Sequence, residues 1–579
     1  MIKIARKNLV VIPTMLAVAF LLLQVFCDLY LPTITADLID KGVINHNLAY
    51  IKHEGMMMLL VSLVGLVAAT INTFFASTQA MAVGRKLRKQ VFDKVMQFSN
   101  KEISELGDSS LITRSTNDVV QVQMVMFQTL RMMLQSPIMM IAAVILAYHR
   151  EAKLTMIFLI SLPVLMLTVV IVMRKAVPLF RSIQKKTDRI NLVFREGLTR
   201  VRVIRAFNQD ERERNRFHNV NEDYTETGIK AFTWVAFLFP AMTLILSLTN
   251  VAIIWYGAHL IANQTMQVGN LVSFLTYAVQ ILFSFMMLAM VFVFVPRGAA
   301  SARRINEVLD YEVAVKDPKP SERLELSSQV PSLQFDHVNF RYQGAEKLSL
   351  NNFNFEVTSG QTLAIIGGTG SGKSTLVNLI DRLFDPESGK IKINGMPIKQ
   401  LTQHDLHTLV SITQQKAVLF AGTIRSNMQF GYPDASDDGI WHALEVAQAR
   451  DFVEAAGGLD AVVEQGGANF SGGQRQRLAI ARTIIKPASI YIFDDSFSAL
   501  DFKTDAKLRQ ALKDDPKLKD AVKVIVAQRV STVADADLIL VLEDGELLGK
   551  GNHQSLKASN QTYQEIIASQ IQKGVTTNA

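Results

Sequence analysis

The chain has 579 residues, 49% of them hydrophobic, and 60 Lys and Arg against 52 Asp and Glu give a net charge of +8. This length exceeds what one hydrophobic core usually organises, so we expect two domains. The basic residues flank apolar stretches, as cytoplasmic loops of membrane proteins do, so the positive charge indicates topology and argues against a nucleic-acid partner. The single cysteine, Cys27, excludes a disulfide framework and a cysteine-based metal site, and we expect it to be a small buried hydrophobe.

The first part of the chain contains six apolar stretches long enough to cross a bilayer, which takes about 20 residues for a helix. They cover residues 9–34, 56–80, 130–147, 154–173, 232–261 and 271–295. The first is too long for a signal-peptide core and no segment resembling a cleavage site follows it, so we interpret it as a retained span. The sequence predicts an all-α membrane domain of six helices over residues 1–310.

Two of the links between these stretches are long and charged, at 81–129 and 174–231. Both continue a 3.6-residue apolar period, so we expect the spans to extend as long helices beyond the membrane. Basic residues at the N-terminus and in both links place all three on the cytoplasmic side. Polar or charged stretches interrupt the links at 107–114 and 197–207.

Polar and adaptable side chains within the spans are candidates for a functional role. Asp28 follows Gln24 by one turn in the first stretch, and an intramembrane carboxylate indicates either a functional group or an outer-leaflet position exposed to water. The sixth stretch is rich in Phe and Met, which could line an adaptable cavity or only face lipid and neighbouring helices. These residues are Phe283, Phe285, Met286, Met287 and Met290.

Residues 311–332 have the Pro, Ser and charge content of a linker, and we expect a second domain at 333–579. That domain begins with strands, continues with a glycine-rich loop that opens a helix, and later contains two buried strands separated by helical patterns. This alternation predicts an α/β nucleotide-binding layout.

The run GGTGSGKST, at 367–375, follows an apolar strand and opens a helix, which is the setting of a phosphate-binding loop. Its glycines allow backbone N–H groups to turn toward phosphate oxygens at a helix N-terminus. Lys373 would neutralise the β and γ phosphates, and Ser374 would hold Mg²⁺. The alternative is a chance glycine-rich turn. The other members of the loop are Gly367, Gly368, Thr369, Gly370, Ser371, Gly372 and Thr375.

Two further motifs follow this loop. Asp494 ends the apolar strand IYIFD, where its carboxylate could bind the hydration shell of Mg²⁺. Between the loop and this strand a polar glycine turn opens another helix, and taken alone it could simply cap that helix. Its residues are Ser471, Gly472, Gly473 and Gln474.

The order of phosphate loop, SGGQ, DD, SALD and QRVST resembles the ATPase domain of ATP-binding-cassette (ABC) proteins. The six spans with two long intracellular links resemble the membrane domain of the exporters of that family, so the resemblance covers nearly the whole chain. It implies the type I exporter fold, also called type IV, with ATP and Mg²⁺ as cofactors. By this resemblance Tyr342 would stack on adenine, Gln415 would sense Mg²⁺ and couple to the membrane domain, and Asp501 would communicate across a dimer.

The resemblance also gives the SGGQ turn a function. ATPase domains of this family pack head to tail in pairs, so the turn of one chain would cap the ATP held by the phosphate loop of the other. A lone chain would contain no complete site. Phe470 precedes the turn in place of the usual leucine, a conservative change in an apolar position.

Two residues depart from the family pattern in the chain's own site. Asp495 stands where a catalytic glutamate is usual, and its side chain is one methylene too short to polarise the attacking water well. Gln528 replaces the switch histidine, and an amide cannot carry a proton or a positive charge. The pattern resembles the degenerate-site subunit of heterodimeric bacterial multidrug exporters.

We therefore expect ATP-driven efflux of hydrophobic or amphiphilic compounds by a heterodimer with a second, homologous half-transporter. We expect it in a bacterial plasma membrane, in contact with lipid, with the N-terminus and the ATPase domain in the cytoplasm. The alternative is an ATP-gated regulator or channel subunit that binds nucleotide without pumping. The six spans disfavour a soluble DNA-repair or translation ATPase, and the fusion of both domains disfavours an importer subunit.

Overall fold

The computed structural model describes residues 2–326 and 330–576, which form two compact units. The first comprises Met1–Met96 and Gly107–Tyr311, and the second comprises Gln97–Leu106 and Glu312–Ala579. Residues 327–329 of the expected linker and the last three residues of the expected nucleotide-binding domain lie outside the described residues.

The first unit is entirely helical. Its helices are α1 (Ile2–Asn8), α2 (Val11–Asp37), η1 (Leu38–Val43), α3 (Leu48–Val95), α5 (Asp108–Ser115), α6 (Asn117–Gln128), η2 (Thr129–Met133), α7 (Leu134–Arg150), α8 (Ala152–Thr199), α9 (Val201–Ala206), α10 (Asp210–Ala262) and α11 (Val268–Leu309). Within the described residues, six helical segments are long and apolar enough to cross a bilayer, which confirms the expected six-span domain.

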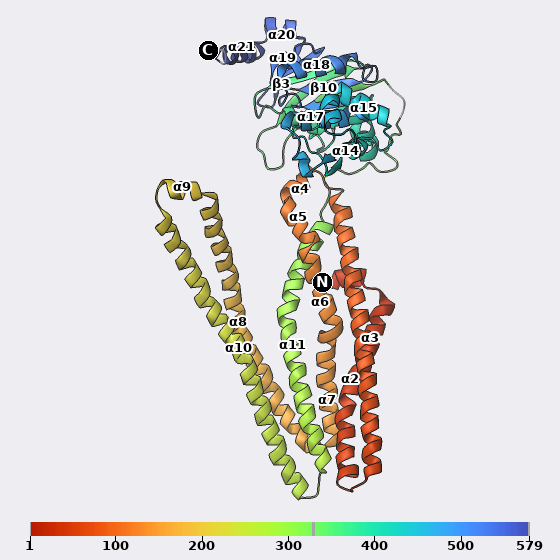
Figure 1. Ribbon diagram of the computed structural model, residues 1–579, viewed down its shortest axis with the longest axis vertical. Helices are drawn as coiled ribbons and strands as arrows, with labels where there is room; N and C mark the ends of the chain where they lie inside the picture. The colour runs from red at the N-terminus through yellow and green to blue at the C-terminus, as the bar shows by residue number, and fades with distance from the viewer. Residues whose placement is uncertain (1, 327–329, 577–579) are drawn as a thin grey trace. The chain divides into compact units, whose positions relative to one another are not determined.

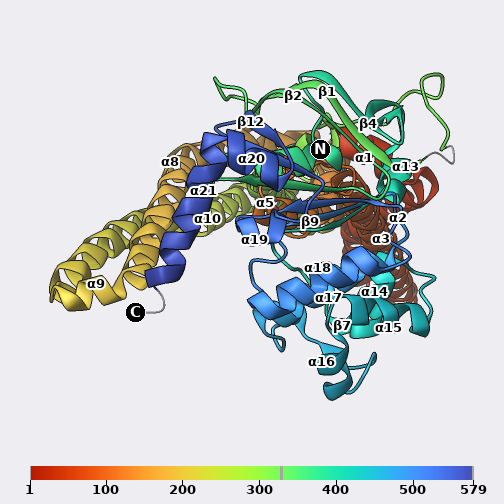
Figure 2. The same cartoon turned by 90° about the horizontal axis from the view of Figure 1, so that it is seen from above.

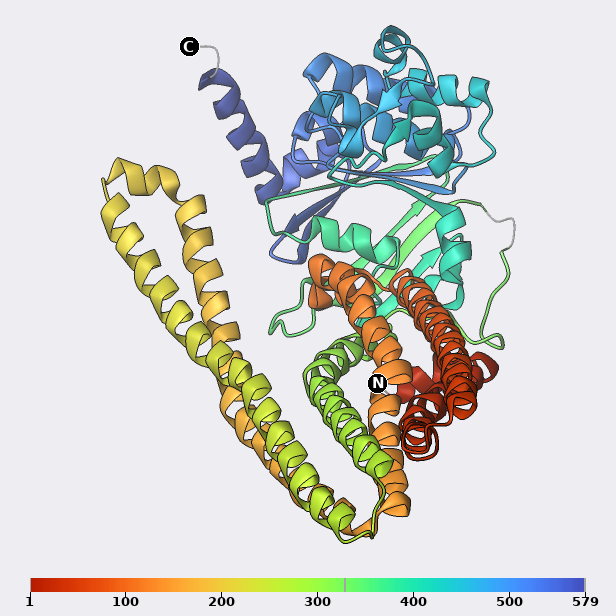
Figure 3. The ribbon, with the colours of Figure 1, turned by 60° about the horizontal axis from the view of Figure 1, so that its bottom comes forward.

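The long helical extensions expected beyond the spans are also present. Helices α3 and α8 have 48 residues each and α10 has 53. At 1.5 Å per residue each is roughly 70 to 80 Å long, more than twice the hydrocarbon thickness of a bilayer. Figures 1 and 3 show α8 and α10 side by side, joined by α9 and diverging from the other helices of this unit.

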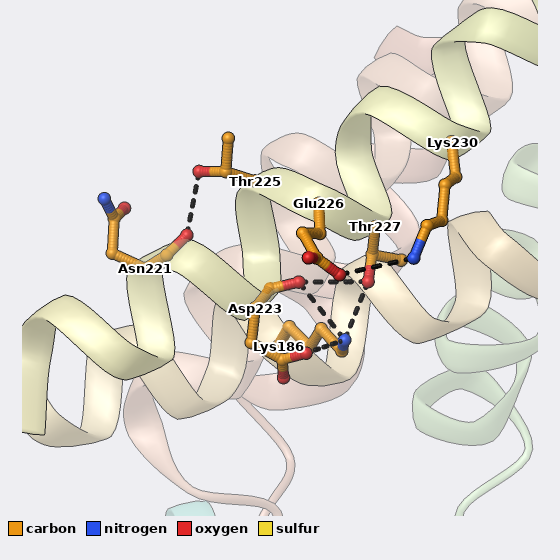
Figure 4. Close-up of polar contacts among 7 residues, drawn as sticks. All are labelled: Lys186, Asn221, Asp223, Thr225, Glu226, Thr227 and Lys230. Carbon is orange, nitrogen blue, oxygen red and sulfur yellow. Dashed lines mark hydrogen bonds and ion pairs between the residues drawn. The ribbon is translucent and has the colours of Figure 1, made fainter.

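A polar cluster joins the two helices of this hairpin (Figure 4). Lys186 on α8 donates through Nζ to the backbone oxygen and Oδ1 of Asp223, at 3.2 and 2.5 Å, and to Oγ1 of Thr227 at 2.7 Å. Lys230 and Glu226 form a further ion pair along α10, at 3.2 Å. Charge-assisted hydrogen bonds of this kind hold α8 and α10 in one register.

Close packing and buried ion pairs organise the rest of the first unit. A Cβ atom at Gly84 of α3 would lie 2.1 Å from Nε2 of Gln123 on α6, so only glycine permits this approach. The buried carboxylate of Asp118 on α6 accepts hydrogen bonds from Arg304 on α11. Cys27 is buried and unpaired, as expected for a small hydrophobe.

In the second unit a ten-stranded sheet is described, with the order β5-β4-β1-β2-β12-β11-β3-β10-β9-β6. The strands are β1 (Ser332–Phe340), β2 (Leu350–Thr358), β3 (Thr362–Gly367), β4 (Ser388–Ile393), β5 (Met396–Pro397), β6 (Val410–Thr413), β9 (Ile490–Asp494), β10 (Val522–Val526), β11 (Leu538–Glu543) and β12 (Glu546–Gly551). Strands β11, β3, β10, β9 and β6 are parallel to their neighbours within this group. A separate pair, β7 (Gly422–Thr423) and β8 (Val462–Val463), is antiparallel.

Helices cover both faces of the parallel part, because successive side chains of a strand point to opposite faces. On β3, Leu363 and Ile365 belong to one buried cluster with Leu376 of α12 (Lys373–Ile380). Ala364 and Ile366 belong to another, with residues of α17 (Gly472–Ile485) and α18 (Phe502–Asp514), which Figure 2 shows beside β9. The observed α/β domain confirms the layout that the sequence predicts.

The structure describes further helices in this unit, several of which add side chains to the core that contains Ala364 and Ile366 of β3. They are α4 (Asn100–Leu106), α13 (Gln403–Leu409), η3 (Ile398–Gln400), α14 (Ile424–Gly431), α15 (Asp437–Val446), α16 (Arg450–Ala455), η4 (Gln465–Gly467), α19 (Val530–Val533), α20 (His553–Ser559) and α21 (Gln561–Thr576). The buried carboxylate of Glu102 on α4 accepts a hydrogen bond from the backbone N–H of Ala314 at 2.7 Å, which ties α4 to the start of the expected linker.

Candidate ATP-binding site

Four neighbouring parallel strands direct polar residues to one edge of the sheet. The phosphate loop follows β3, Gln528 follows β10, Asp494 ends β9 and Gln415 follows β6. The carboxyl ends of parallel strands meet at the same edge, which is where α/β proteins bind ligands. A cavity of about 730 Å³ lies there and is lined by residues of all four segments.

The phosphate loop has the backbone geometry that its glycines predict. Gly370 and Gly372 have φ values of +86° and +103°, in the left-handed region that favours glycine. A Cβ atom at Gly372 would lie 3.0 Å from the backbone oxygen of Ser349, so the site also requires the absence of a side chain there. Lys373 then opens α12, and its Nζ donates to the backbone oxygens of Gly367 and Gly368 at 2.9 and 2.5 Å. Backbone oxygens of the loop therefore accept hydrogen bonds from Lys373. In the nucleotide-bound protein, oxygens of a polyphosphate would accept these hydrogen bonds instead.

The cavity wall places Lys373, Ser374 and Asp494 together. Burial lowers the pKa of Lys373, although the carboxylates of Asp495 and Asp494 oppose that shift. Burial raises the pKa of Asp494 to about 6, the negative charge of Asp495 adds to the increase, and Lys373 and a hydrogen bond from Ser374 oppose it. A hydroxyl and a carboxylate that line one cavity wall fit a Mg²⁺ ion that takes its other oxygen ligands from phosphate and water.

The two residues that depart from the family pattern contact one another. Gln528 donates from Nε2 to Oδ2 of Asp495 at 2.9 Å, and Nε2 of Gln415 lies 3.5 Å from the same oxygen. Asp495 has a φ of +46°, a left-handed conformation that Asp adopts more readily than most residues. Its carboxylate is therefore engaged by side-chain amides in the position where a catalytic base would need to face water.

Tyr342 lies on the same cavity, where its ring is partly exposed. Its hydroxyl is 3.1 Å from Oγ1 of Thr375, and the rings of Phe340 and Phe384 contact it edge to face, with centroids 4.9 and 5.4 Å away. These contacts hold the ring beside the phosphate loop, a position compatible with stacking on a nucleotide base.

The SGGQ turn and Asp501 do not line this cavity. Ser471 caps α17 in a capping box: its Oγ accepts from the N–H of Gln474 at 3.3 Å, and the Gln474 side chain accepts from the N–H of Ser471 at 2.8 Å. Phe470 is buried, which agrees with an apolar position before the turn. The cap that the sequence allows is thus present, and it leaves Ser471 and Gly472 exposed and Gly473 and Gln474 half-buried.

Asp501 opens the next helix in the same way. Its Oδ1 accepts from the N–H groups of Thr504 and Lys503, at 2.9 and 3.1 Å. The hydrogen bond from Thr504 lowers the pKa of Asp501, and that from Lys503 adds to the effect.

The sequence did not single out several residues that line the cavity. Asp544 and Gly545 form a tight turn between β11 and β12 with φ values of +46° and +82°, and Gly545 donates from its N–H to the backbone oxygen of Ser371 at 3.3 Å. An Asp-Gly pair between two apolar runs is a hairpin signal that the sequence does contain. That this hairpin borders the phosphate loop depends on the pairing of β11 with β3.

The six spans, the phosphate loop and the acidic strand end together define an ATP-binding-cassette transporter. Residues 14–285 match the family model of the ABC transporter transmembrane region, and residues 350–498 match that of the ABC transporter. The chain is 38% identical over 552 residues to an uncharacterized ABC transporter ATP-binding protein of Mycobacterium tuberculosis, covering 95% of this chain and 94% of that relative. The chain belongs to the ABC transporter family, whose ATPase domains drive transport.

Two other proteins are similar to this chain over most of its length. The chain is 28% identical over 513 residues to a multidrug resistance ABC transporter ATP-binding and permease protein of Lactococcus lactis, with 88% of this chain and 85% of that protein covered. The solved structure of a bacterial Atm1-family ABC exporter with ATP bound superposes with a TM-score of 0.80 at 24% identity, covering 96% of this chain and 97% of that one. The fold is that of an ABC exporter.

Because the pKa of Asp494 is raised to about 6, we expect the affinity for magnesium nucleotide to fall in acid. Mg²⁺ requires the carboxylate, so below pH 6 a proton competes and affinity should drop about tenfold per pH unit. Titration with a fluorescent ATP analogue and Mg²⁺ between pH 5 and 7.5 measures this. Asp494→Asn should retain only the pH dependence of the nucleotide itself, and identical profiles for the two proteins would contradict the prediction.

Proposed function

We propose that the chain is the degenerate-site half of a heterodimeric exporter of hydrophobic or amphiphilic compounds. The observation that carries this proposal is the 2.9 Å hydrogen bond from Gln528 to Asp495. Both positions at which hydrolysis needs a glutamate and a histidine hold shorter or neutral side chains, and these side chains satisfy one another. Such a site can hold ATP and Mg²⁺ while providing little general-base catalysis.

The SGGQ turn supports the second half of the proposal. Its capping box presets the N-terminus of α17, a 14-residue helix, and occupies the N–H of Gln474. The N–H groups of Gly472 and Gly473 take no part in the box and could face an anion. Neither this turn nor Asp501 lines the chain's own cavity, so both are available to the nucleotide of another chain. A partner with a competent site would therefore receive an intact turn from this chain.

Transport by the assembled pair tests the function. We expect ATP-dependent uptake of a hydrophobic dye into inside-out vesicles that contain this chain and its partner, and we expect the partner to carry Glu and His at the two matching positions. Nucleotide binding without uphill uptake would instead indicate the ATP-gated regulator. A partner with Asp and Gln at those positions would rule out the heterodimer.

The intracellular links are proposed to transmit force between the two kinds of domain. Residues 97–106 of the first link belong to the second compact unit, next to the stretch at 107–114. The tip of the second link, at 197–207, exposes apolar side chains, among them Val203 at 55% and Phe207 at 72%. An exposed apolar tip on a braced helical hairpin is suited to docking on an ATPase domain.

We expect Phe207→Asp to lower transport by the heterodimer about tenfold while basal ATP hydrolysis changes little, because a charge placed in an apolar contact weakens docking by more than 1 kcal/mol. Dye uptake and phosphate release, measured on the same vesicles, separate the two effects. Leu192→Asp, on the same hairpin and also exposed, is the matched control and should transport normally. Equal loss in both variants would show that the tip has no special role.

A further inference from the structure

The C-terminal helix α21 makes two hydrogen bonds to the backbone of the segment that follows β10. Oε1 of Gln570 accepts from the N–H of Val530 at 2.9 Å, and its Nε2 donates to the backbone oxygen of Gln528 at 2.7 Å. A side-chain amide carries both a donor and an acceptor, so one glutamine can engage two backbone groups at once. Gln570 therefore fixes the backbone on both sides of Arg529.

Helix α21 holds this amide in a defined place. Tyr563 is fully buried, and Ile566 and Ile567 are partly buried against the hydrophobic cluster that includes Tyr563 and Val533 of α19. These three residues of α21 and Gln570 follow the spacing i, i+3, i+4 and i+7, which places them on one face of a helix. The apolar face that anchors α21 thus ends in a polar amide that contacts the segment 528–530.

The strand pairing of β10 ends just before this segment. Beyond the end of β10, the N–H of Ala527 donates to the backbone oxygen of Ile365 at 3.1 Å. Helix α19 begins at Val530, whose N–H is among those that a helix leaves without an intrahelical partner. Its N-cap residue, Arg529, supplies no side-chain cap. Gln570 therefore provides, from another helix, the acceptor that a capping side chain normally supplies.

A second contact to this segment comes from residues that follow β9. Arg529 donates from Nη2 to the backbone oxygen of Ser498 at 3.4 Å, and its guanidinium carbon lies 4.8 Å from the centroid of the Phe502 ring. Both contacts are made by the end of a long side chain, whereas Gln570 binds the peptide groups themselves. The backbone direction at Gln528, and with it the place of the Gln528 side chain, therefore depends most directly on Gln570.

The Gln528 side chain lies at the ATP-binding cavity. Its Nε2 donates to Oδ2 of Asp495, and both residues line the cavity together with Lys373. Lys373 is the residue that we expect to neutralise the β and γ phosphates, so an amide N–H held on the same cavity is suited to recognise the γ-phosphate. The γ-phosphate is the group that distinguishes ATP from ADP.

We propose that Gln570 is a positioning residue for ATP recognition. It holds the backbone at Gln528 and Val530 so that the Gln528 amide faces the site of the γ-phosphate. The inference rests on the part of the proposed function in which this chain's own site holds ATP. It gives α21, which contains none of the nucleotide-binding motifs, a role in discriminating ATP from ADP.

Nucleotide binding by the full-length chain in phosphatidylcholine nanodiscs tests this role. The probes are N-methylanthraniloyl ATP and ADP, each with Mg²⁺, which share the fluorophore and differ in the γ-phosphate. Gln570→Glu keeps the length and the acceptor of the side chain but cannot donate to the backbone oxygen of Gln528. We expect it to weaken ATP binding about fivefold, about 1 kcal/mol, and to leave ADP binding unchanged within about twofold. Retained ADP binding also shows that the domain is folded.

A double-variant comparison separates positioning from general stabilisation. Gln528→Ala should show the same ATP-specific loss, and adding Gln570→Glu to it should cause no further loss, because Gln570 acts through Gln528. Gln564→Glu is the matched control. Gln564 lies on the same helix and donates to the backbone oxygen of Lys557 at 2.8 Å, and neither residue lines the cavity. This variant should bind both nucleotides normally.

Unaltered ATP binding in Gln570→Glu, equal loss of ATP and ADP binding, or a further loss in the Gln528→Ala background would overturn the proposal. The outcome is separable from that of the degenerate-site proposal. Brisk hydrolysis by the homodimer together with the expected ATP-specific losses would refute only the degenerate site. Slow hydrolysis together with ATP binding that Gln570→Glu leaves unchanged would refute only the role of Gln570.

Discussion

Replacing Ser471 by Arg in the assembled heterodimer should reduce ATP hydrolysis roughly 100-fold, because loss of preorganised donors to a developing phosphate charge costs this much in comparable sites. Ser471 begins the turn that we propose caps the partner's ATP, and its capping box presets the N-terminus of α17. A bulky cation there would destroy the box and occupy the space needed by the γ-phosphate. Phosphate release by the purified pair measures the effect.

The matched variant in the chain's own site is Asp495→Asn, which we expect to lower the same activity by only about threefold or less. The carboxylate already accepts from Gln528 and lies near Gln415, so its removal takes away little transition-state stabilisation. Severe loss in Asp495→Asn combined with normal turnover in Ser471→Arg would mean that we have assigned the two sites the wrong way round.

Replacing both Asp495 and Gln528 by the residues usual in the family should have the second large effect on ATP turnover. A homodimer of this chain would contain two intact SGGQ turns and two degenerate sites, so we expect its ATP turnover to be low. Asp495→Glu together with Gln528→His should raise that turnover by about 100-fold, the range that a positioned general base contributes. The measurement is steady-state phosphate release by the purified homodimer.

Single variants are the controls for this experiment. Asp495→Glu alone should gain little, since Gln528 would still lack the charge and proton of a histidine. Ser471→Arg added to the double variant should abolish the gain, because each restored site depends on the turn of the other chain. Brisk hydrolysis by the unaltered homodimer would refute the degenerate-site proposal.

Local patterns in the sequence were sufficient for the architecture and for most of the ATP-binding site. An apolar stretch long enough to cross a bilayer is a property of consecutive residues, and the six spans follow from it. The phosphate loop is equally local, because its glycines, its lysine and the start of α12 are contiguous. The apolar strand IYIFD likewise placed Asp494 at a strand end, and parallel strands bring such ends together.

Contacts between distant segments were decided only by the tertiary structure. Asp495 and Gln528 are 33 residues apart, and their hydrogen bond depends on β9 and β10 being neighbours in the sheet. The Asp-Gly hairpin reaches the phosphate loop because β11 pairs with β3. The periodicity of a strand or helix specifies which face is buried and leaves open which element covers that face. The sequence therefore determined the residues available for chemistry, whereas the packing of strands and helices decided which of them meet.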